Sequence, residues 1–136
     1  MAKKTGQWTG QLLSGRYLVG DVLGKGGMGE VYQAIQQELN RPVAIKVLNR
    51  DLAEHPDWLS RLELEAKAAA SLGHPNIVQI SDFQHSIGEP AFIVMELLEG
   101  RSLEQVIRKD RQLQQKRVAF IAAQVLSALD RTHKAG

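Results

Sequence analysis

The order of apolar and polar positions divides the chain into a strand-rich part and a helical part. In PVAIKVL, residues 42–48, successive side chains would form two apolar faces, and the segment is rich in β-branched residues. This pattern predicts a β-strand. Similar signals predict strands near 17–23, 77–83 and 90–98. The first 14 residues are polar and aperiodic, which predicts a flexible tail.

Helical spacing is clearest in two places. Residues 56–72 repeat apolar side chains at steps of three and four, and Pro56 suits the first turn of a helix. Residues 100–136 are expected to be helical, with a short helix near 102–109 and a long one over 115–135. The stretch 30–42 is ambiguous, because Val31, Ile35 and Leu39 fit a helix whereas Val31, Gln33 and Ile35 fit a strand.

The segment GKGGMGEVY, residues 24–32, places four glycines between two predicted strands. A P-loop would need lysine where Glu30 stands, so that motif is excluded. Three interpretations stay open from the residues alone. One is a dinucleotide-binding GxGxxG turn, which needs a helix starting at Gly29 and an acidic residue about 20 residues further along the chain. Asp51 lies at nearly that distance from the motif. The others are a kinase-type GxGxxGxV hairpin completed by Val31, and an ordinary flexible turn.

Two charged residues interrupt apolar faces. Lys46 is the one charged residue in PVAIKVL, although lysine is rarely buried without a partner. Glu65 falls in the helical stripe formed by Trp58, Leu62, Ala69 and Leu72. We therefore predict that Lys46 and Glu65 pair.

Composition narrows the class of protein without identifying a partner. The 136 residues fit one domain or part of a larger one, and the net charge of +2 favours no nucleic-acid surface. The absence of cysteine suits a cytoplasmic protein. There is no secretory signal or apolar run long enough for a membrane span, and the scattered histidines predict no metal site.

From about Gly15 to Gly136 the chain resembles the bacterial eukaryotic-type Ser/Thr protein kinases. The resemblance rests on GKGGMGEVY, VAIK, ELEAKAAASLGHPNIV and FIVMELLEGRSLEQVI, in this order and spacing. It implies an α+β fold: a small lobe over residues 15–98, made of a twisted antiparallel sheet of about five strands and one C-helix, then the first two large-lobe helices over 99–136. It also implies that residues 30–36 form a strand.

The resemblance implies an ATP site. Lys46 would meet the α- and β-phosphates, oriented by Glu65, beneath a glycine-rich loop. Met95 would be the gatekeeper, and Ala69 and Ile80 small-lobe members of the regulatory spine. Glu99 and Ser102 stand where family members contact ribose. The full set of residues expected to bind the nucleotide is Leu23, Gly24, Lys25, Gly26, Gly27, Met28, Gly29, Val31, Ala44, Lys46, Met95, Glu96 and Leu98.

The chain departs from the family in what it lacks. No His-Arg-Asp motif, magnesium-binding asparagine or Asp-Phe-Gly motif follows residue 129, and Asp82-Phe83-Gln84 is interpreted as strand. We therefore expect the isolated chain to be inactive, although the family transfers the ATP γ-phosphoryl group to protein Ser/Thr with Mg²⁺. The alternatives are a non-catalytic nucleotide-binding or interaction module completed by another chain, and a dinucleotide-binding oxidoreductase. Because helix 115–135 is apolar almost all round, we expect self-association or binding of a missing large lobe through it.

Overall fold

A computed structural model describes residues 4–135 of the protein. The chain divides into two compact units, which are described separately. The first unit contains the residues up to Ser71 together with Gln79–Leu97, and the second contains Leu72–Val78 and the residues from Leu98 onwards.

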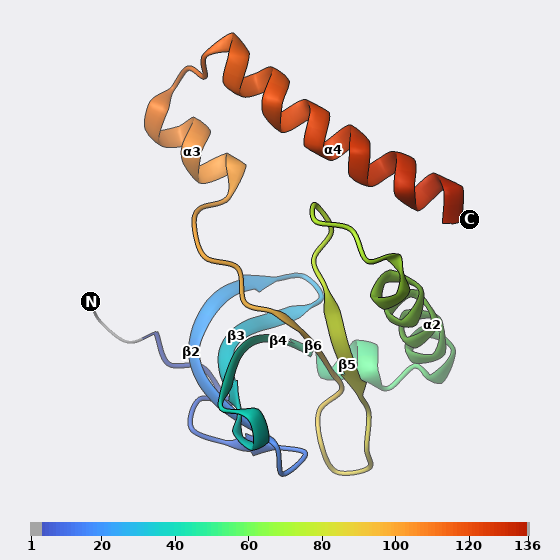
Figure 1. The fold of residues 1–136 in the computed structure, drawn as a ribbon. Helices are drawn as coiled ribbons and strands as arrows, with labels where there is room; N and C mark the ends of the chain where they lie inside the picture. Colours follow the sequence, from blue (N-terminus) through green and yellow to red (C-terminus); the bar gives the residue numbers. More distant parts are fainter. Residues whose placement is uncertain (1–3, 136) are drawn as a thin grey trace. The chain divides into compact units, whose positions relative to one another are not determined.

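A curled antiparallel sheet of six strands forms the first unit (Figure 1). This confirms the predicted sheet, with one short strand more than expected. The strands occur in the order β1-β2-β3-β4-β6-β5, and every neighbouring pair is antiparallel. Their bounds are β1 Leu12–Leu13, β2 Tyr17–Gly26, β3 Gly29–Gln36, β4 Arg41–Leu48, β5 Ile80–Gln84 and β6 Phe92–Glu96.

The alternation along β4 explains where the main core lies. Val43, Ile45 and Val47 are all nearly inaccessible and belong to one apolar cluster. Ala44 and Lys46 face the other side of the sheet, as the sequence predicted. Each large apolar side chain buried in this way contributes about 1.5–3 kcal/mol. The cluster consists of Leu13, Tyr17, Val19, Val22, Tyr32, Ala34, Val43, Ile45, Val47, Phe92 and Val94.

Three helical segments complete the first unit: the 3-10 turn η1 Gln37–Leu39, the short helix α1 Arg50–Ala53 and the long helix α2 Pro56–Leu72. The sequence predicted α2 but neither of the short ones. Helix α2 lies beside β5 (Figure 1) and packs Trp58, Leu59 and Leu62 against a second cluster that includes Leu48 and Phe83.

The buried stripe of α2 differs from the predicted one. Leu59 and Ala66 are the buried residues of the helix, whereas Trp58 and Leu62 are only partly covered. Glu65 is exposed. Leu59 and Ala66 are seven residues apart and therefore lie on one face of the helix, and Leu59 packs against Leu48 and Ala91.

The N-terminal residues also differ from the expectation of a flexible tail over 1–14. Residues 1–3 lie outside the described part of the chain, but Leu12–Leu13 forms β1 and pairs with β2. Leu13 is 3% exposed, and Trp8 packs against the main core cluster. Two apolar side chains in a polar segment are sufficient here, because the edge of β2 offers backbone groups for pairing.

Three predictions about strands can be compared with the observed sheet. Residues 29–36 form strand β3. Strands β5 and β6 are shorter than predicted, and β5 starts later because Ile77 donates its backbone N–H to the His74 carbonyl in a turn. Asp82 lies in β5, as expected, and accepts a hydrogen bond of 2.8 Å from the Tyr17 hydroxyl.

The second unit contains helices α3 Leu103–Asp110 and α4 Gln115–Ala135, at the predicted positions. Ser102 caps α3, since its hydroxyl accepts from the Gln105 backbone N–H while the Gln105 side chain accepts from the Ser102 backbone. This reciprocal capping box explains why α3 begins where it does.

The polar side of α4 holds the turn at residues 72–78. Ser127 lies 3.0 Å from the His74 ring, Gln124 accepts from Asn76 at 2.9 Å, and Arg131 donates to the Leu72 carbonyl at 3.2 Å. His74 also accepts from the Asn76 backbone, so it braces this turn as predicted.

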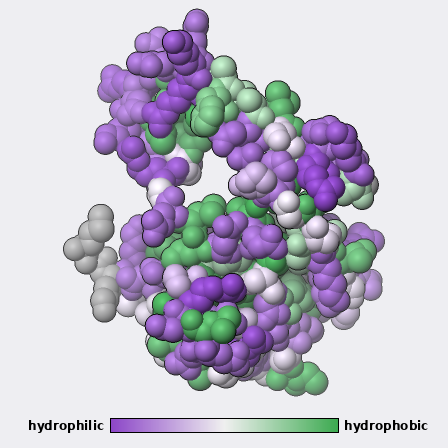
Figure 2. All heavy atoms as spheres, in the orientation of Figure 1, coloured by the Kyte–Doolittle hydropathy of each residue, from purple (hydrophilic) through white to green (hydrophobic). Residues whose placement is uncertain are grey.

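Much of the apolar surface of α4 is exposed. The relative exposures of Phe120 and Leu126 are 67% and 65%. Figure 2 shows apolar side chains reaching the visible surface of both units. Among residues 4–135, no helix combines the length and the hydropathy needed to cross a bilayer.

Candidate functional site

The glycine-rich segment is a tight β-hairpin. Strands β2 and β3 pair up to Gly26 opposite Gly29, and the two residues between them, Gly27 and Met28, form the turn. A dinucleotide-binding site would require a helix beginning at Gly29, whereas Gly29 begins a strand. The structure therefore contradicts the oxidoreductase alternative.

The glycines of the hairpin differ in what surrounds them. A Cβ atom added at Gly24 or Gly27 would have no neighbour within 4 Å, and one at Gly26 would meet only the Gly29 carbonyl oxygen, at 4.0 Å. Gly29 is the opposite case. Its φ is +149°, and a Cβ there would lie 2.0 Å from the Val47 carbonyl oxygen. The fold requires glycine at position 29, but sterically it does not require glycine at 24, 26 or 27.

Asn49, which the sequence analysis missed, holds the tip of the hairpin. Its side-chain amide donates to the Gly27 carbonyl at 2.8 Å, and its backbone N–H donates to the Met28 carbonyl at 3.0 Å. Asn49 directly follows β4, so the strand that carries Lys46 also fixes the turn above it. No local pattern marks Asn49, because its partners lie more than twenty residues earlier in the chain.

Lys46 lies at the centre of the sheet face opposite the main core. It is directly opposite Val31 on β3 and Ile93 on β6, so all three share this face. Its side chain is partly buried, and its Nζ atom lies 3.9 Å from the Met28 sulfur. Within the described chain, no carboxylate lies within 4.0 Å of this ammonium group.

Glu65, the predicted partner of Lys46, is exposed on α2. The ion pairs within 4.0 Å among residues 4–135 do not include Lys46–Glu65. The neighbouring carboxylate of α2, Glu63, pairs with Lys67 at 2.6 Å. The structure thus shows no contact between Lys46 and Glu65, and their pairing stays a prediction.

Of the residues expected to bind the nucleotide, Val31, Ala44, Lys46 and Met95 share one face of the sheet. Ala44 lies opposite Met95, and Met95 lies opposite Ile80, which was expected in the regulatory spine. Ala44 is 5% exposed, whereas Leu23, beside the register shift of β2, is 49% exposed. This face therefore offers an apolar surface next to one cation.

Residues 96–102 link the two units. Glu96 ends β6 and binds Gln79 twice, through its backbone N–H at 3.0 Å and its carboxylate at 2.7 Å. Leu98 is 64% exposed, and Glu99 is exposed as well. The Ser102 hydroxyl, proposed for ribose, is already used to cap α3.

A second polar group stabilises the base of the hairpin. Lys25 and Glu30 lie opposite each other and pair at 2.5 Å, and the buried Tyr32 donates its hydroxyl to the other oxygen of Glu30. The hydrogen bonds from Lys25 and then Tyr32 lower the pKa of Glu30. Burial, followed by the bond to Glu30, raises the pKa of Tyr32 to about 12. Glu30 thus stays ionised as the acceptor and Tyr32 stays protonated as the donor.

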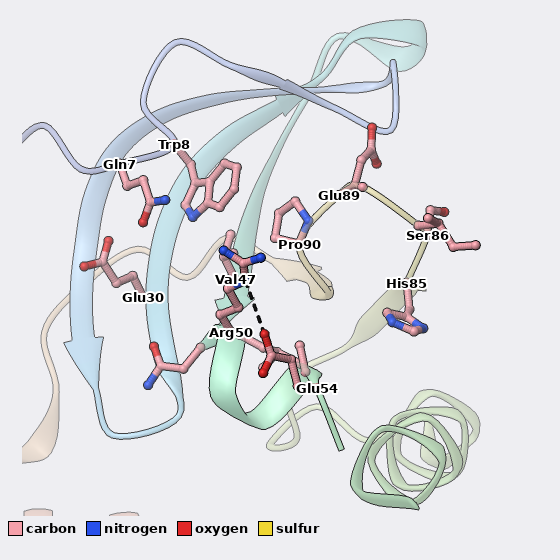
Figure 3. Close-up of a pocket in the computed structure, with 15 residues that line it drawn as sticks. Gln7, Trp8, Glu30, Val47, Arg50, Glu54, His85, Ser86, Glu89 and Pro90 are labelled. Carbon is pink, nitrogen blue, oxygen red and sulfur yellow. Dashed lines mark ion pairs between the residues drawn. The ribbon is translucent and has the colours of Figure 1, made fainter. Parts of the chain in front are cut away.

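A cavity of about 560 Å³ lies on the other side of the sheet, next to the main core (Figure 3). Trp8 and Glu30 lie along one wall, and the β5–β6 turn, with His85 and Pro90, lies along another. None of the residues predicted to bind the nucleotide lines this cavity. Within the described residues, no group of three or more His, Cys, Asp or Glu side chains is placed to hold a metal ion.

Comparison with known proteins confirms the resemblance inferred from the motifs. The family model described as the protein kinase domain matches residues 17–136. The chain is 38% identical over 132 residues to the serine/threonine-protein kinase pkn3 of Myxococcus xanthus, and 40% identical over 127 residues to the serine/threonine-protein kinase PknB of Mycobacterium leprae. The crystal structure of the Mycobacterium tuberculosis PknI kinase domain superposes with a TM-score of 0.80 at 30% identity.

These matches cover nearly all of this chain but only part of its relatives. They include 97% and 91% of the chain, compared with 24% of pkn3 and 20% of PknB. The match to the PknI kinase domain covers 97% of this chain and 54% of that domain. The chain therefore belongs to the protein kinase family, as part of a kinase domain similar to those of bacterial Ser/Thr protein kinases.

Proposed function

We propose that this chain is the ATP-binding part of a Ser/Thr protein kinase. In this proposal the β2–β3 hairpin covers the phosphates, Lys46 contacts them from β4, and the face around Ala44 and Met95 receives the adenine ring. The acceptor would be a protein serine or threonine, as the printed names of the relatives indicate for those proteins.

The proposal rests mainly on the open backbone of the hairpin. Glycine in a strand reduces stability relative to a residue with a side chain. Gly24 and Gly26 nevertheless stand where the fold would accept a Cβ atom. The missing side chains leave room for something outside the chain to approach the backbone, and phosphate oxygens accept readily from backbone N–H groups.

Lys46 supports the same site through charge. A partly buried ammonium group with no carboxylate nearby is costly unless something compensates for the lost hydration. A phosphate group would do so, because the lysine ammonium is a compact charge on a flexible stem. Lys46 would hold the α- and β-phosphates, and Glu65 would turn towards it when nucleotide is bound.

The open hairpin backbone and the Lys46 ammonium group fit the phosphates of ATP. Among the described residues no three His, Cys, Asp or Glu side chains are grouped to hold a metal ion, so the proposal gives these residues no role in binding Mg²⁺. When bound, ATP supplies the transferable γ-phosphoryl group. What these residues would do is bind and orient the nucleotide.

The test is direct titration of the 136-residue chain with ATP in magnesium-free buffer. Loss of a hydrogen bond to a charged group costs about 1.5–3 kcal/mol, so Lys46→Met should weaken ATP binding about 10- to 150-fold. Gly26→Val should also weaken it, because the added side chain enters the open space above the hairpin. Lys67→Met, which removes an exposed cation paired with Glu63, is the control.

Unfolding measured in parallel separates binding from stability. Both variants should unfold at denaturant concentrations close to that of the parent chain. Equal ATP affinity for the parent chain and Lys46→Met would refute the assignment of Lys46.

A further inference from the structure

The N-terminal segment, defined as residues 4–13, lies before the family match, which begins at residue 17. It nevertheless runs along the outer edge of β2. Val22 donates its backbone N–H to Lys4 at 2.8 Å, Gly10 donates to Val19 at 2.8 Å, and Val19 donates to Gln11 at 2.9 Å. These bonds occupy backbone groups that would otherwise be unpaired at a sheet edge.

The segment binds β2 where that strand is least regular. The pairing of β2 with β3 shifts register between Val19 and Val22 and again between Val22 and Gly24. Within the first of these shifts the Gly20 carbonyl accepts a hydrogen bond from the Thr9 hydroxyl at 2.9 Å. The part of β2 that leads into the glycine hairpin is therefore held from its outer side.

The segment also touches the side chains behind the hairpin. A Cβ atom at Gly6 would lie 2.5 Å from the Tyr32 hydroxyl oxygen and 2.6 Å from Val22 Cγ2, so the backbone passes directly over Tyr32. Tyr32 is fully buried and cannot move aside easily. Its hydroxyl binds Glu30, and Glu30 binds Lys25 of the hairpin. Figure 3 shows Trp8 and Glu30 from these two elements around the cavity.

We propose that the N-terminal segment is a positioning element for the glycine hairpin, acting through Tyr32 and Glu30 on Lys25. It touches no nucleotide itself. The glycines of the turn have no side chains with which to pack, so its position depends on such tethers. Asn49 holds the tip from the β4 side, and the N-terminal segment fixes the base from the β2 side.

The inference rests on the proposed function for its first test, which compares ATP with adenosine. The glycine turn at residues 24–29 would meet the phosphates and not the base, so displacing this turn should weaken the binding of ATP and not that of adenosine. Gly6→Val forces the segment away from Tyr32, and Tyr32→Phe removes the link to Glu30 while keeping the ring packed. We expect ATP affinity to fall about three- to tenfold in each, the equivalent of about one hydrogen bond, with adenosine affinity unchanged.

Leu12→Ala is the matched control. Leu12 belongs to the same segment but is 46% exposed and pairs with Leu18, away from Tyr32. It should leave the ratio of ATP to adenosine affinity as in the parent chain. If the segment only stabilised the fold, Gly6→Val and Tyr32→Phe would lower the unfolding midpoint and leave the ratio of ATP to adenosine affinity unchanged.

The second test needs no nucleotide. Amide hydrogen exchange of residues 25–29 in the free chain should be faster in Gly6→Val and Tyr32→Phe than in Leu12→Ala. If the parent chain does not bind ATP, the proposed function fails, and this exchange result still decides whether the segment positions the hairpin. If Gly6→Val does not fold, Tyr32→Phe decides alone. Unchanged exchange in the folded variants would overturn the inference.

Discussion

Gly29 is the hairpin position where substitution should damage the fold rather than the proposed site. A Cβ atom at Gly29 would lie 2.0 Å from the Val47 carbonyl oxygen, 2.9 Å from its carbonyl carbon and 3.0 Å from Leu48 Cα. All three atoms belong to the backbone of β4, so no side-chain rotation relieves the overlap. The φ of +149° adds strain for any residue with a side chain.

The cost of Gly29→Ala can be estimated from two contributions. Holding a non-glycine residue in such a conformation costs about 1–3 kcal/mol. Moving β3 away from β4 also weakens the pairing of Gly29 with Leu48 and the bond from Asn49 to Met28, at about 0.5–1.5 kcal/mol for each hydrogen bond lost. We therefore expect the free energy of unfolding to fall by about 2–6 kcal/mol.

Gly26→Ala is the control in the same hairpin. Its Cβ atom would meet only the Gly29 oxygen at 4.0 Å, an ordinary contact distance, and its φ is not in the range that excludes side chains. Replacing glycine there should leave stability unchanged or raise it by up to about 1 kcal/mol, because the unfolded chain loses conformational freedom.

Urea unfolding of both variants, followed by the fluorescence of Trp8 and Trp58 and by circular dichroism, gives the comparison. Trp8 packs against the main core and so reports on the first unit. A loss of less than about 1 kcal/mol for Gly29→Ala would refute the steric argument, because that is below the lower limit of the strain alone. A comparable loss for Gly26→Ala would show that the glycines serve the turn generally.

Three further predictions concern other parts of the chain. Burial and the bond to Asp82 raise the pKa of Tyr17 from 10.0 to about 12, so the stabilisation that this hydroxyl gives the folded chain is complete below pH 10 and is lost as the pH rises towards 12. The free energy of unfolding of the parent chain should therefore fall by about 2–3 kcal/mol over that range because of Tyr17, and Tyr17→Phe should abolish this part of the fall. Asn49→Ala removes the bond to Gly27 and should weaken ATP binding a few-fold with little change in unfolding midpoint; identical affinity would count against the tether. The 136-residue chain should self-associate through α4, so Phe120→Glu should shift its light-scattering mass towards that of a monomer, and a monomeric parent at high concentration would contradict this expectation.

The sequence alone determined the features that depend on local periodicity. The alternation along residues 42–48 marked β4 and placed Val43, Ile45 and Val47 on one face, and apolar residues at helical spacing marked α2 and α4. Both patterns are local, because side chains three or four residues apart on a helix, or two apart on a strand, must share a face. The motif order added the family, and with it the strand at residues 30–36, which periodicity left ambiguous.

Only the tertiary structure decided which side of α2 meets the sheet. Leu59 packs against Leu48 of β4, Leu59 and Ala66 are the buried residues of the helix, and Glu65 is exposed. The packing of Trp8 was equally hidden, because a single aromatic residue in a polar segment has no period to detect.

The separate roles of the glycines were also settled by contacts between distant residues. Gly26 and Gly29 are equivalent in the sequence motif, and they differ because β4 passes close to one and not to the other. Asn49 holds the turn for the same reason, since it meets Gly27 only after β3 and β4 have paired. Local sequence specifies which faces are apolar, whereas the approach of one backbone to another is a property of the assembled sheet.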